Sequence, residues 1–164
     1  PYTTLFRSLT YILLDNSIYG LTKGQVSPTS PMGMKSGTSP YGNIARPLNP
    51  TTLALAYGAT FVARTFSRER DMVSDLITRA IQHKGFSFIH DLSPCVVFNK
   101  DVTYGSVNSV TAQLPEEHDI LDRSNAMSLA ESTEPVYQGL FFQEKIPSFD
   151  DHVKQVKDGL NKSD

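Results

Sequence analysis

The chain has 164 residues, of which 39% are hydrophobic and 20% charged, with a formal net charge of -2. That length can bury one globular core, and the near balance of charge gives no electrostatic reason to bind nucleic acid or an acidic membrane. No apolar run reaches the ~20 residues of a membrane span, and one cysteine excludes an internal disulfide framework, so we expect a cytoplasmic protein.

The first eight residues, PYTTLFRS (Pro1–Ser8), are interpreted apart from the rest of the chain. They read like translated sequencing-adapter DNA, and our hypothesis is that they form a non-native leader. The alternative is an ordinary N-terminal segment. The chain then opens directly on a strand without an initiator methionine, so we expect residues 9–164 to be the C-terminal part of a larger domain.

Strand and helix patterns alternate from the start of the chain. The apolar run Leu9–Asp15 predicts a strand that is buried on both faces, as in parallel sheets. The stretch 16–49 is rich in Gly, Pro, Ser and Thr and predicts a long loop, which in a compact domain is usually functional or disordered. A helix is expected over Pro50–Tyr57, because Asn49 can cap it and its first residue is proline.

A strand, a helix and another strand are expected next. Ala59–Arg64 is the first of these strands. A helix capped by Ser67 follows, since its apolar positions recur at helical spacing as far as the basic residue Lys84 and the terminator Gly85. Phe86–Leu92 is the second strand. This alternation predicts an α/β fold with a mostly parallel sheet, in which ligands bind at the carboxyl ends of strands.

The pattern is weaker in the last third of the chain. A helix over Leu121–Ser132, a strand over Val136–Gln143 and a polar terminal helix over Phe149–Leu160 are expected. The four histidines show no metal-ligand spacing, so we expect them to be surface or core residues.

Polar and glycine residues follow the first predicted strand. After Asp15 the backbone turns through Gly20 and Gly24 and carries several hydroxyl side chains. Magnesium prefers hard oxygen ligands and often shares them with a phosphate. A side-chain oxygen of Asn16 and a backbone carbonyl two residues on could therefore hold a metal–diphosphate, which glycines let the backbone approach closely. The alternative is a turn that binds no ligand.

The single cysteine follows the strand Phe86–Leu92, in the segment SPCVVFN (Ser93–Asn99). A lone cysteine is more often a buried small hydrophobe than a reactive group. Cys95 cannot hold an iron–sulfur cluster by itself, because such clusters are usually held by four thiolates.

The segment LLDNSIYGLTKGQVSPTSP (Leu13–Pro31) resembles the cofactor loop of the beta, thiamine-diphosphate-binding subunit of 2-oxoacid:ferredoxin oxidoreductases. The resemblance spans about Leu9–Phe149 and is strongest in this loop and in Pro94–Asn99. It implies the thiamine-diphosphate-binding α/β fold for residues 9–164, missing its first strands and followed by a C-terminal tail. The family's Gly-Asp-Gly, with the other metal-binding aspartate, belongs upstream.

The resemblance also implies site residues and cofactors. Magnesium would be held by the side chain of Asn16 and the backbone carbonyl of Ile18, and Cys95 would be the last ligand of a 4Fe-4S cluster whose other ligands lie outside this chain. Lys23 would meet the substrate, although it could equally point to solvent or a phosphate. The residues that would line the diphosphate and the thiazolium are Tyr19, Gly20, Leu21 and Thr22. No side chain is assigned as a catalytic acid or base.

The family reaction converts a 2-oxoacid and coenzyme A to acyl-CoA and CO2 and reduces ferredoxin. The resemblance implies an alpha subunit of the same enzyme, ferredoxin, coenzyme A and the 2-oxoacid as partners. The segment Leu21–Gln25 favours 2-oxoglutarate, with pyruvate or broad specificity as the alternative. A thiamine-dependent carboligase or decarboxylase without electron transfer and a non-catalytic assembly subunit also stay open. We expect the chain alone to be inactive, because half of the metal site is missing.

Overall fold

The computed structural model describes residues 8–147 and 149–160, so all of the predicted leader except Ser8 lies outside the described residues. The elements are, in chain order, β1 (Leu9–Asp15), α1 (Pro50–Ala56), β2 (Phe61–Phe66), α2 (Arg70–Gln82), β3 (Phe86–Leu92), α3 (Tyr104–Val110), β4 (Thr111–Gln113), α4 (Arg123–Glu131), β5 (Val136–Gln143) and α5 (Phe149–Leu160). None of the helices in the described part of the chain is long and apolar enough to cross a membrane.

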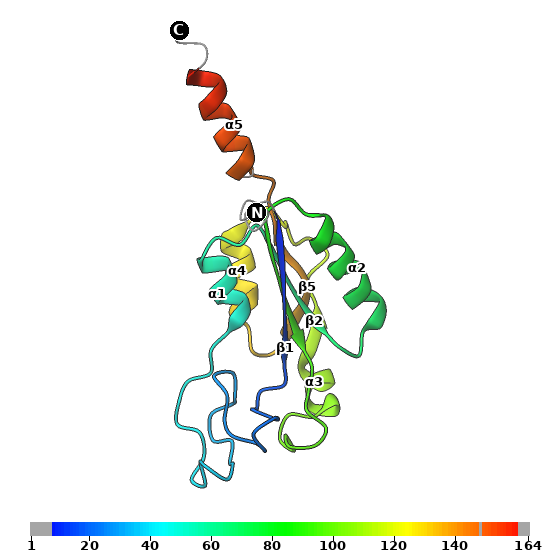
Figure 1. Ribbon diagram of the computed structural model, residues 1–164. Helices are drawn as coiled ribbons and strands as arrows, with labels where there is room; N and C mark the ends of the chain where they lie inside the picture. The colour runs from blue at the N-terminus through cyan, green and yellow to red at the C-terminus, as the bar shows by residue number, and fades with distance from the viewer. Residues whose placement is uncertain (1–7, 148, 161–164) are drawn as a thin grey trace.

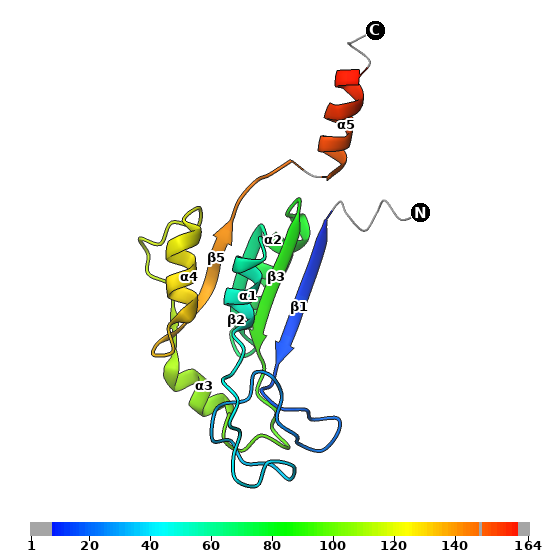
Figure 2. The ribbon, with the colours of Figure 1, turned by 90° about the vertical axis from the view of Figure 1, so that its left-hand side faces the viewer.

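The strands form one sheet in the order β1-β3-β2-β5-β4. β1, β3 and β2 run parallel, as the alternation of strands and helices predicts, and β4 is parallel to β5. β5 is antiparallel to β2, so the sheet as a whole is mixed. The fold is therefore α/β, with the predicted parallel part confirmed at the β1 side of the sheet (Figure 2).

Helices cover both faces of the sheet (Figure 1). Side chains alternate between the faces of a strand, so neighbouring residues of β2 enter different cores. Val62 joins a cluster with α1 and α4 that includes Leu55 and Phe141. Phe61 joins a second cluster with α2 that includes Leu76. The helix α5 extends away from this body in both views (Figures 1 and 2).

The predicted element bounds hold for the strands β1, β3 and β5 and for the helix α5. The predicted cap of α2 at Ser67 is wrong: the N–H of Ser67 donates to the carbonyl of Leu92, which continues the pairing of β2 with β3. The helix therefore begins later, at Arg70, and the residue at its cap position, Glu69, makes no side-chain capping bond. The short elements α3 and β4 were not predicted from the sequence.

The strand β1 is not buried on both faces, contrary to the prediction. It lies at the edge of the sheet, paired only with β3 among the described residues. Tyr11 and Leu14 are 51% and 67% exposed. The apolar run identified the strand correctly, but within the described part of the chain few residues cover its side chains.

The parallel strands end at the same edge of the sheet. Asp15 at the end of β1 is in register with Leu92 of β3, and Leu92 with Phe66 of β2. The N–H of Ser93 also donates to the carbonyl of Asp15 at 2.8 Å. The loops that carry the two motifs, after β1 and after β3, therefore leave the sheet next to each other, at the lower end of Figure 1.

Candidate functional site

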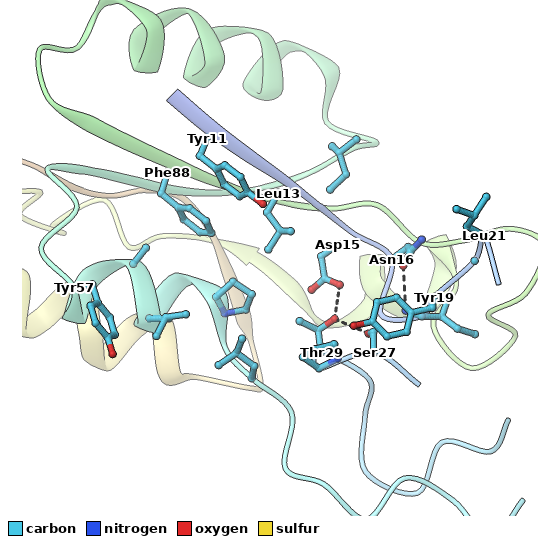
Figure 3. A pocket seen from close by; sticks show the side chains of 18 of the residues that line it. Tyr11, Leu13, Asp15, Asn16, Tyr19, Leu21, Ser27, Thr29, Tyr57 and Phe88 are labelled. Carbon is cyan, nitrogen blue, oxygen red and sulfur yellow. Dashed lines mark hydrogen bonds between the residues drawn. The ribbon is translucent and has the colours of Figure 1, made fainter. Parts of the chain in front are cut away.

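A cavity of about 1260 Å³ opens between β1, the loop that follows it and α1. One end is apolar and includes Tyr11, Leu13 and Phe88, while Asp15 and Thr29 line the other end (Figure 3). The residues that we predicted as cofactor or magnesium contacts all line it, and they are Asn16, Ile18, Tyr19, Gly20, Leu21 and Thr22. A largely apolar hollow with a few convergent polar groups is typical of a small-molecule site.

The carboxylate of Asp15 organises the polar end of this cavity. Its Oδ1 accepts the N–H of Ser17 at 2.8 Å and the hydroxyl of Thr29 at 2.6 Å, and its Oδ2 lies 2.9 Å from Nε2 of His90. Burial by itself raises the pKa of Asp15, but the hydrogen bonds from His90, Thr29 and Ser17 together leave it below the ordinary value. The carboxylate is ionised near neutral pH. Both of its oxygens accept hydrogen bonds from neighbouring residues of the protein.

His90 connects this carboxylate to the interior of the sheet. The ring is 4% exposed, and its Nδ1 lies 3.1 Å from the hydroxyl of Thr51 in α1. Burial lowers the pKa of His90 by more than Asp15 raises it, so the ring is neutral at pH 7. One tautomer satisfies every partner: Nε2–H donates to Asp15, and Nδ1 accepts the hydroxyl of Thr51, which itself accepts from Arg64.

Arg64 of β2 is a buried cation at the inner end of this network. Its guanidinium donates to the side chain of Asn49 and to the carbonyls of Ala130 and Tyr137, and it stacks over the ring of Phe141 at 5.2 Å. Burial lowers its pKa to about 10. Since Asn49 caps α1 as predicted, Arg64 ties the helices α1 and α4 to the sheet behind the cavity.

The long loop after β1 is folded on itself by side-chain bonds to the backbone. The fully buried hydroxyl of Ser30 accepts the N–H of Ser27 at 2.8 Å and donates to the carbonyl of Ser17 at 2.7 Å. The side-chain nitrogen of Asn43 donates to the carbonyl of Ser30 at 2.9 Å. These contacts give the loop a defined shape, as in functional loops of this length.

The predicted magnesium ligands lie at the start of this loop. Oδ1 of Asn16 accepts the N–H of Ile18 at 3.1 Å, so both residues belong to one tight turn. In the described residues no group of three His, Cys, Asp or Glu side chains could hold a metal. An amide oxygen and a backbone carbonyl suit a hard cation that takes its remaining ligands from phosphate, water or other parts of the protein. The residues at the turn therefore fit a magnesium–diphosphate.

A small hairpin follows the turn. The N–H of Tyr19 donates to the carbonyl of Gln25, and the N–H of Gly24 donates to the carbonyl of Tyr19, both at 2.9 Å. The hydroxyl of Thr22 donates to the side chain of Gln25. Lys23 is exposed at the tip with a φ of 74°, and it does not line the cavity. Lys23 thus belongs to the hairpin that lines the site, but its side chain lies outside the lining of the cavity.

Cys95 is partly exposed, so it is not the fully buried hydrophobe of the alternative interpretation. Its Sγ accepts the N–H of Phe98 at 3.4 Å, and backbone hydrogen bonds from Phe98 and Val97 lower its pKa. A Cβ placed on Gly20 would lie 3.9 Å from this sulfur. A partly exposed thiol with a lowered pKa, close to the loop after β1, suits a metal ligand.

Sequence reasoning missed the residues that hold these loops in place. His90 was expected only to be a surface or core residue, Ser30 only to be one of the hydroxyl side chains of the loop, and Asn99 received no role. The available signal was a histidine inside the apolar strand FSFIHDL, because a buried polar side chain needs a partner. Nothing in the sequence identifies that partner as Asp15.

Comparisons with known proteins match both halves of the chain. Residues 4–90 match the family described as "Thiamine pyrophosphate enzyme, C-terminal TPP binding domain". Residues 95–158 match the family that describes the C-terminal region of the pyruvate ferredoxin oxidoreductase beta chain. The first match covers more than half of the chain and includes the strand β1, the loop after it and most of β3.

Individual relatives agree with these families. The chain is 34% identical over 158 residues to the 2-oxoglutarate synthase subunit KorB of Methanocaldococcus jannaschii, covering 93% of this chain and 57% of that protein. It is 38% identical over 110 residues to the 2-oxoglutarate oxidoreductase subunit KorB of Mycobacterium tuberculosis, covering 67% of this chain and 28% of that protein.

A solved structure is similar over most of the chain. It is the 2-oxoglutarate:ferredoxin oxidoreductase from Magnetococcus marinus, with 2-oxoglutarate, coenzyme A and succinyl-CoA bound. The TM-score is 0.87 at 38% identity, and the match covers 93% of this chain and 53% of that chain. The chain therefore spans between 28% and 57% of the length of these relatives.

Proposed function

Because the chain belongs to the thiamine pyrophosphate enzymes, and within them to the family of 2-oxoacid:ferredoxin oxidoreductase beta subunits, we propose that it serves the oxidative decarboxylation of a 2-oxoacid. The favoured substrate is 2-oxoglutarate, which appears in the names of both KorB relatives and of the similar solved structure. The reaction uses coenzyme A, yields acyl-CoA and CO2, and passes electrons to ferredoxin.

One observation carries this proposal: the hairpin that lines the cavity lies against the sulfur of Cys95. A Cβ placed on Gly20 would lie 3.9 Å from this sulfur, and the same hairpin belongs to the loop that begins at Asn16. A thiamine site that must pass electrons to a cluster needs the two sites to be adjacent. A thiamine-dependent carboligase needs no such neighbour.

Each predicted site residue has a role in this proposal. The side chain of Asn16 and the carbonyl of Ile18 hold Mg2+, and Cys95 is one ligand of a 4Fe-4S cluster. The hairpin residues Tyr19, Gly20, Leu21 and Thr22 line the diphosphate and the thiazolium. When bound at this site, thiamine diphosphate would supply a nucleophilic carbon and an electron sink for the decarboxylation. The chain's own contribution is to orient the cofactor and to exclude water with the apolar wall of the cavity.

The chain acts with partners in this proposal. The relatives are named as subunits, and we expect an alpha subunit of the same enzyme, with ferredoxin as the electron acceptor, in the cytoplasm. In this proposal, residues 9–164 belong to a thiamine-diphosphate-binding domain and its C-terminal tail.

The test is the substitution Cys95→Ser in the full-length protein assembled with its partner subunit. Iron content and 2-oxoglutarate-dependent ferredoxin reduction should fall together, because the serine hydroxyl is a poor cluster ligand. Thiamine diphosphate binding should be retained and serves as the internal control. If the variant keeps the wild-type iron content and normal electron transfer, Cys95 is not a cluster ligand.

The same wild-type preparation separates the alternatives. Protein that binds thiamine diphosphate but holds no iron would be a carboligase or decarboxylase without electron transfer. Protein that binds no thiamine diphosphate would be a non-catalytic assembly subunit.

A further inference from the structure

Asn99 lies in the same loop as Cys95 and is 3% exposed. Its Oδ1 accepts the N–H of Asp101 at 3.2 Å and the N–H of Val102 at 2.9 Å. Its Nδ2 donates to the backbone carbonyl of Asn16 at 3.1 Å. One side chain therefore closes a local turn after the cysteine and reaches across to the first residue of the cofactor loop.

The orientation of this carboxamide follows from its partners. The N–H groups of Asp101 and Val102 are donors, so they must face the side-chain oxygen of Asn99. The carbonyl of Asn16 is an acceptor, so it must face the nitrogen. The interaction with Asn16 is thus the one that a carboxylate of the same shape could not make, since it has no hydrogen to donate.

The two loops also lie close to each other at Gly20. A Cβ at this position would lie 3.8 Å from Nδ2 of Asn16, 3.9 Å from Sγ of Cys95 and 3.9 Å from the ring of Phe98. The cysteine loop and the cofactor loop therefore share one contact surface, and the Asn99 bond is a directed polar link across it. A shift of one loop must either move the other or break this bond.

We propose that Asn99 is a positioning residue that couples the two cofactor sites, so that a cluster on Cys95 strengthens the binding of Mg2+–thiamine diphosphate at Asn16. The inference rests on the proposed function, which assigns those cofactors to those residues. Such a coupling is reciprocal: the factor by which the cluster improves diphosphate binding equals the factor by which the diphosphate improves cluster binding.

The experiment measures the affinity of full-length protein for Mg2+–thiamine diphosphate with the cluster present and after its removal by a chelator. In the wild type we expect the cluster-loaded form to bind about tenfold more tightly, which corresponds to about 1.4 kcal/mol. In Asn99→Asp this ratio should fall to about one, because the aspartate keeps the turn with Val102 but cannot donate to Asn16.

The matched control is Asn43→Asp. Asn43 is also buried, its oxygen accepts the N–H of Ala45, and its nitrogen donates to the carbonyl of Ser30 within the cofactor loop. The substitution makes the same chemical change in that loop, and none of the hydrogen bonds of Asn43 reaches the cysteine loop. The affinity of Asn43→Asp for Mg2+–thiamine diphosphate should fall both with and without the cluster. The ratio of these two affinities should stay near the wild-type value.

The inference is overturned if the wild-type ratio is one, or if Asn99→Asp keeps the wild-type ratio. If Asn99→Asp does not fold, Asn99→Ser replaces it, since its short hydroxyl side chain cannot span both sets of partners. A reverse measurement needs no variant: at equilibrium with a competing chelator, thiamine diphosphate should raise the affinity of the protein for the cluster about tenfold, and an unchanged affinity overturns the coupling. Wild-type protein without iron or without diphosphate binding would instead overturn the proposed function.

Discussion

Two regions of the molecule are stabilised by different forces. One is the packed body of the sheet, and the other, called the edge below, is formed by the loops at the carboxyl ends of β1 and β3. The body consists of apolar clusters on both faces, with side chains such as Phe61 and Phe141 fully buried. The edge consists of loops held by single polar side chains, among them Asp15, Ser30 and Asn99. Apolar packing is spread over many atoms, whereas each polar bond has one geometry and one partner.

This difference predicts a separation of stability from ligand binding. Substitutions in the body should lower the free energy of unfolding and leave the site intact in the molecules that remain folded. Substitutions at the edge should lower ligand affinity at little cost in unfolding free energy.

The largest effect is expected for Phe61→Ala in the body. The ring is fully buried beneath α2, and the substitution leaves a cavity, so the free energy of unfolding should fall by about 3–5 kcal/mol. Urea denaturation of the full-length protein measures this loss. Ile81→Ala on the same helix is the control, since Ile81 is 65% exposed and should cost less than about 0.5 kcal/mol. A matching fall in cofactor affinity of the folded variant would contradict the separation.

The second effect is expected at the edge. Asn16→Leu removes one hard oxygen ligand at similar side-chain volume, so the affinity for Mg2+–thiamine diphosphate should fall about 100-fold, or about 2.7 kcal/mol. A titration of the full-length protein measures this affinity. The control Asn125→Leu replaces an exposed amide on α4 and should bind the cofactor normally. Unchanged affinity in Asn16→Leu would reject this residue as a metal ligand.

The body was easier to predict from the sequence than the edge. The bounds of β1, β3 and β5 follow from apolar runs whose period and ends are local properties of the chain. The start of α2 does not, because Ser67 is a good cap by residue type but its N–H is used by Leu92 of another strand. The exposure of β1 also escaped prediction, since an apolar run says that a strand can be buried and does not say what covers it.

At the edge, the resemblance located the loop and indicated Asn16, Ile18 and Tyr19–Thr22, all of which line the cavity. The residues that hold the loop in place could not be deduced in the same way. His90 meets Asp15, and Asn99 meets Asn16, across sequence separations of 75 and 83 residues. Pairing over such distances depends on strand order and register, which short motifs do not encode.

The third effect concerns pH and lies in the body, at the end of α2. His83 is buried with its Nε2 2.8 Å from the hydroxyl of Thr60, and burial lowers its pKa below the ordinary 6.5. The unfolded chain binds a proton near pH 6.5, whereas the folded protein binds it only at lower pH. The stability contributed by neutral His83 is therefore complete above pH 6.5 and is lost as the pH falls below it.

His83→Gln should make the free energy of unfolding depend less on pH below 6.5, because glutamine can still donate to Thr60 but does not titrate. The difference in slope is at most about 1.4 kcal/mol per pH unit. Urea denaturation across this pH range measures it. His90 has a pKa lowered by burial as well, so part of the slope should remain in the variant. Equal slopes in wild type and variant would mean that His83 does not titrate differently in the folded protein.

The smallest effect is expected for Lys23, which tests how far substrate recognition extends along the edge. 2-Oxoglutarate carries a second carboxylate where pyruvate has a methyl group, and an ammonium near that carboxylate favours 2-oxoglutarate alone. Lys23 is exposed at the tip of the hairpin, so solvent screens the interaction and limits it to about 1 kcal/mol. Lys23→Ala should therefore lower kcat/KM for 2-oxoglutarate about fivefold more than for pyruvate.

The control is Lys35→Ala, which removes another exposed lysine of the same loop and should change neither value. Equal losses on both substrates in Lys23→Ala would mean that the lysine supports the cofactor or the hairpin, and specificity would then have to come from residues closer to the cavity or from the partner subunit.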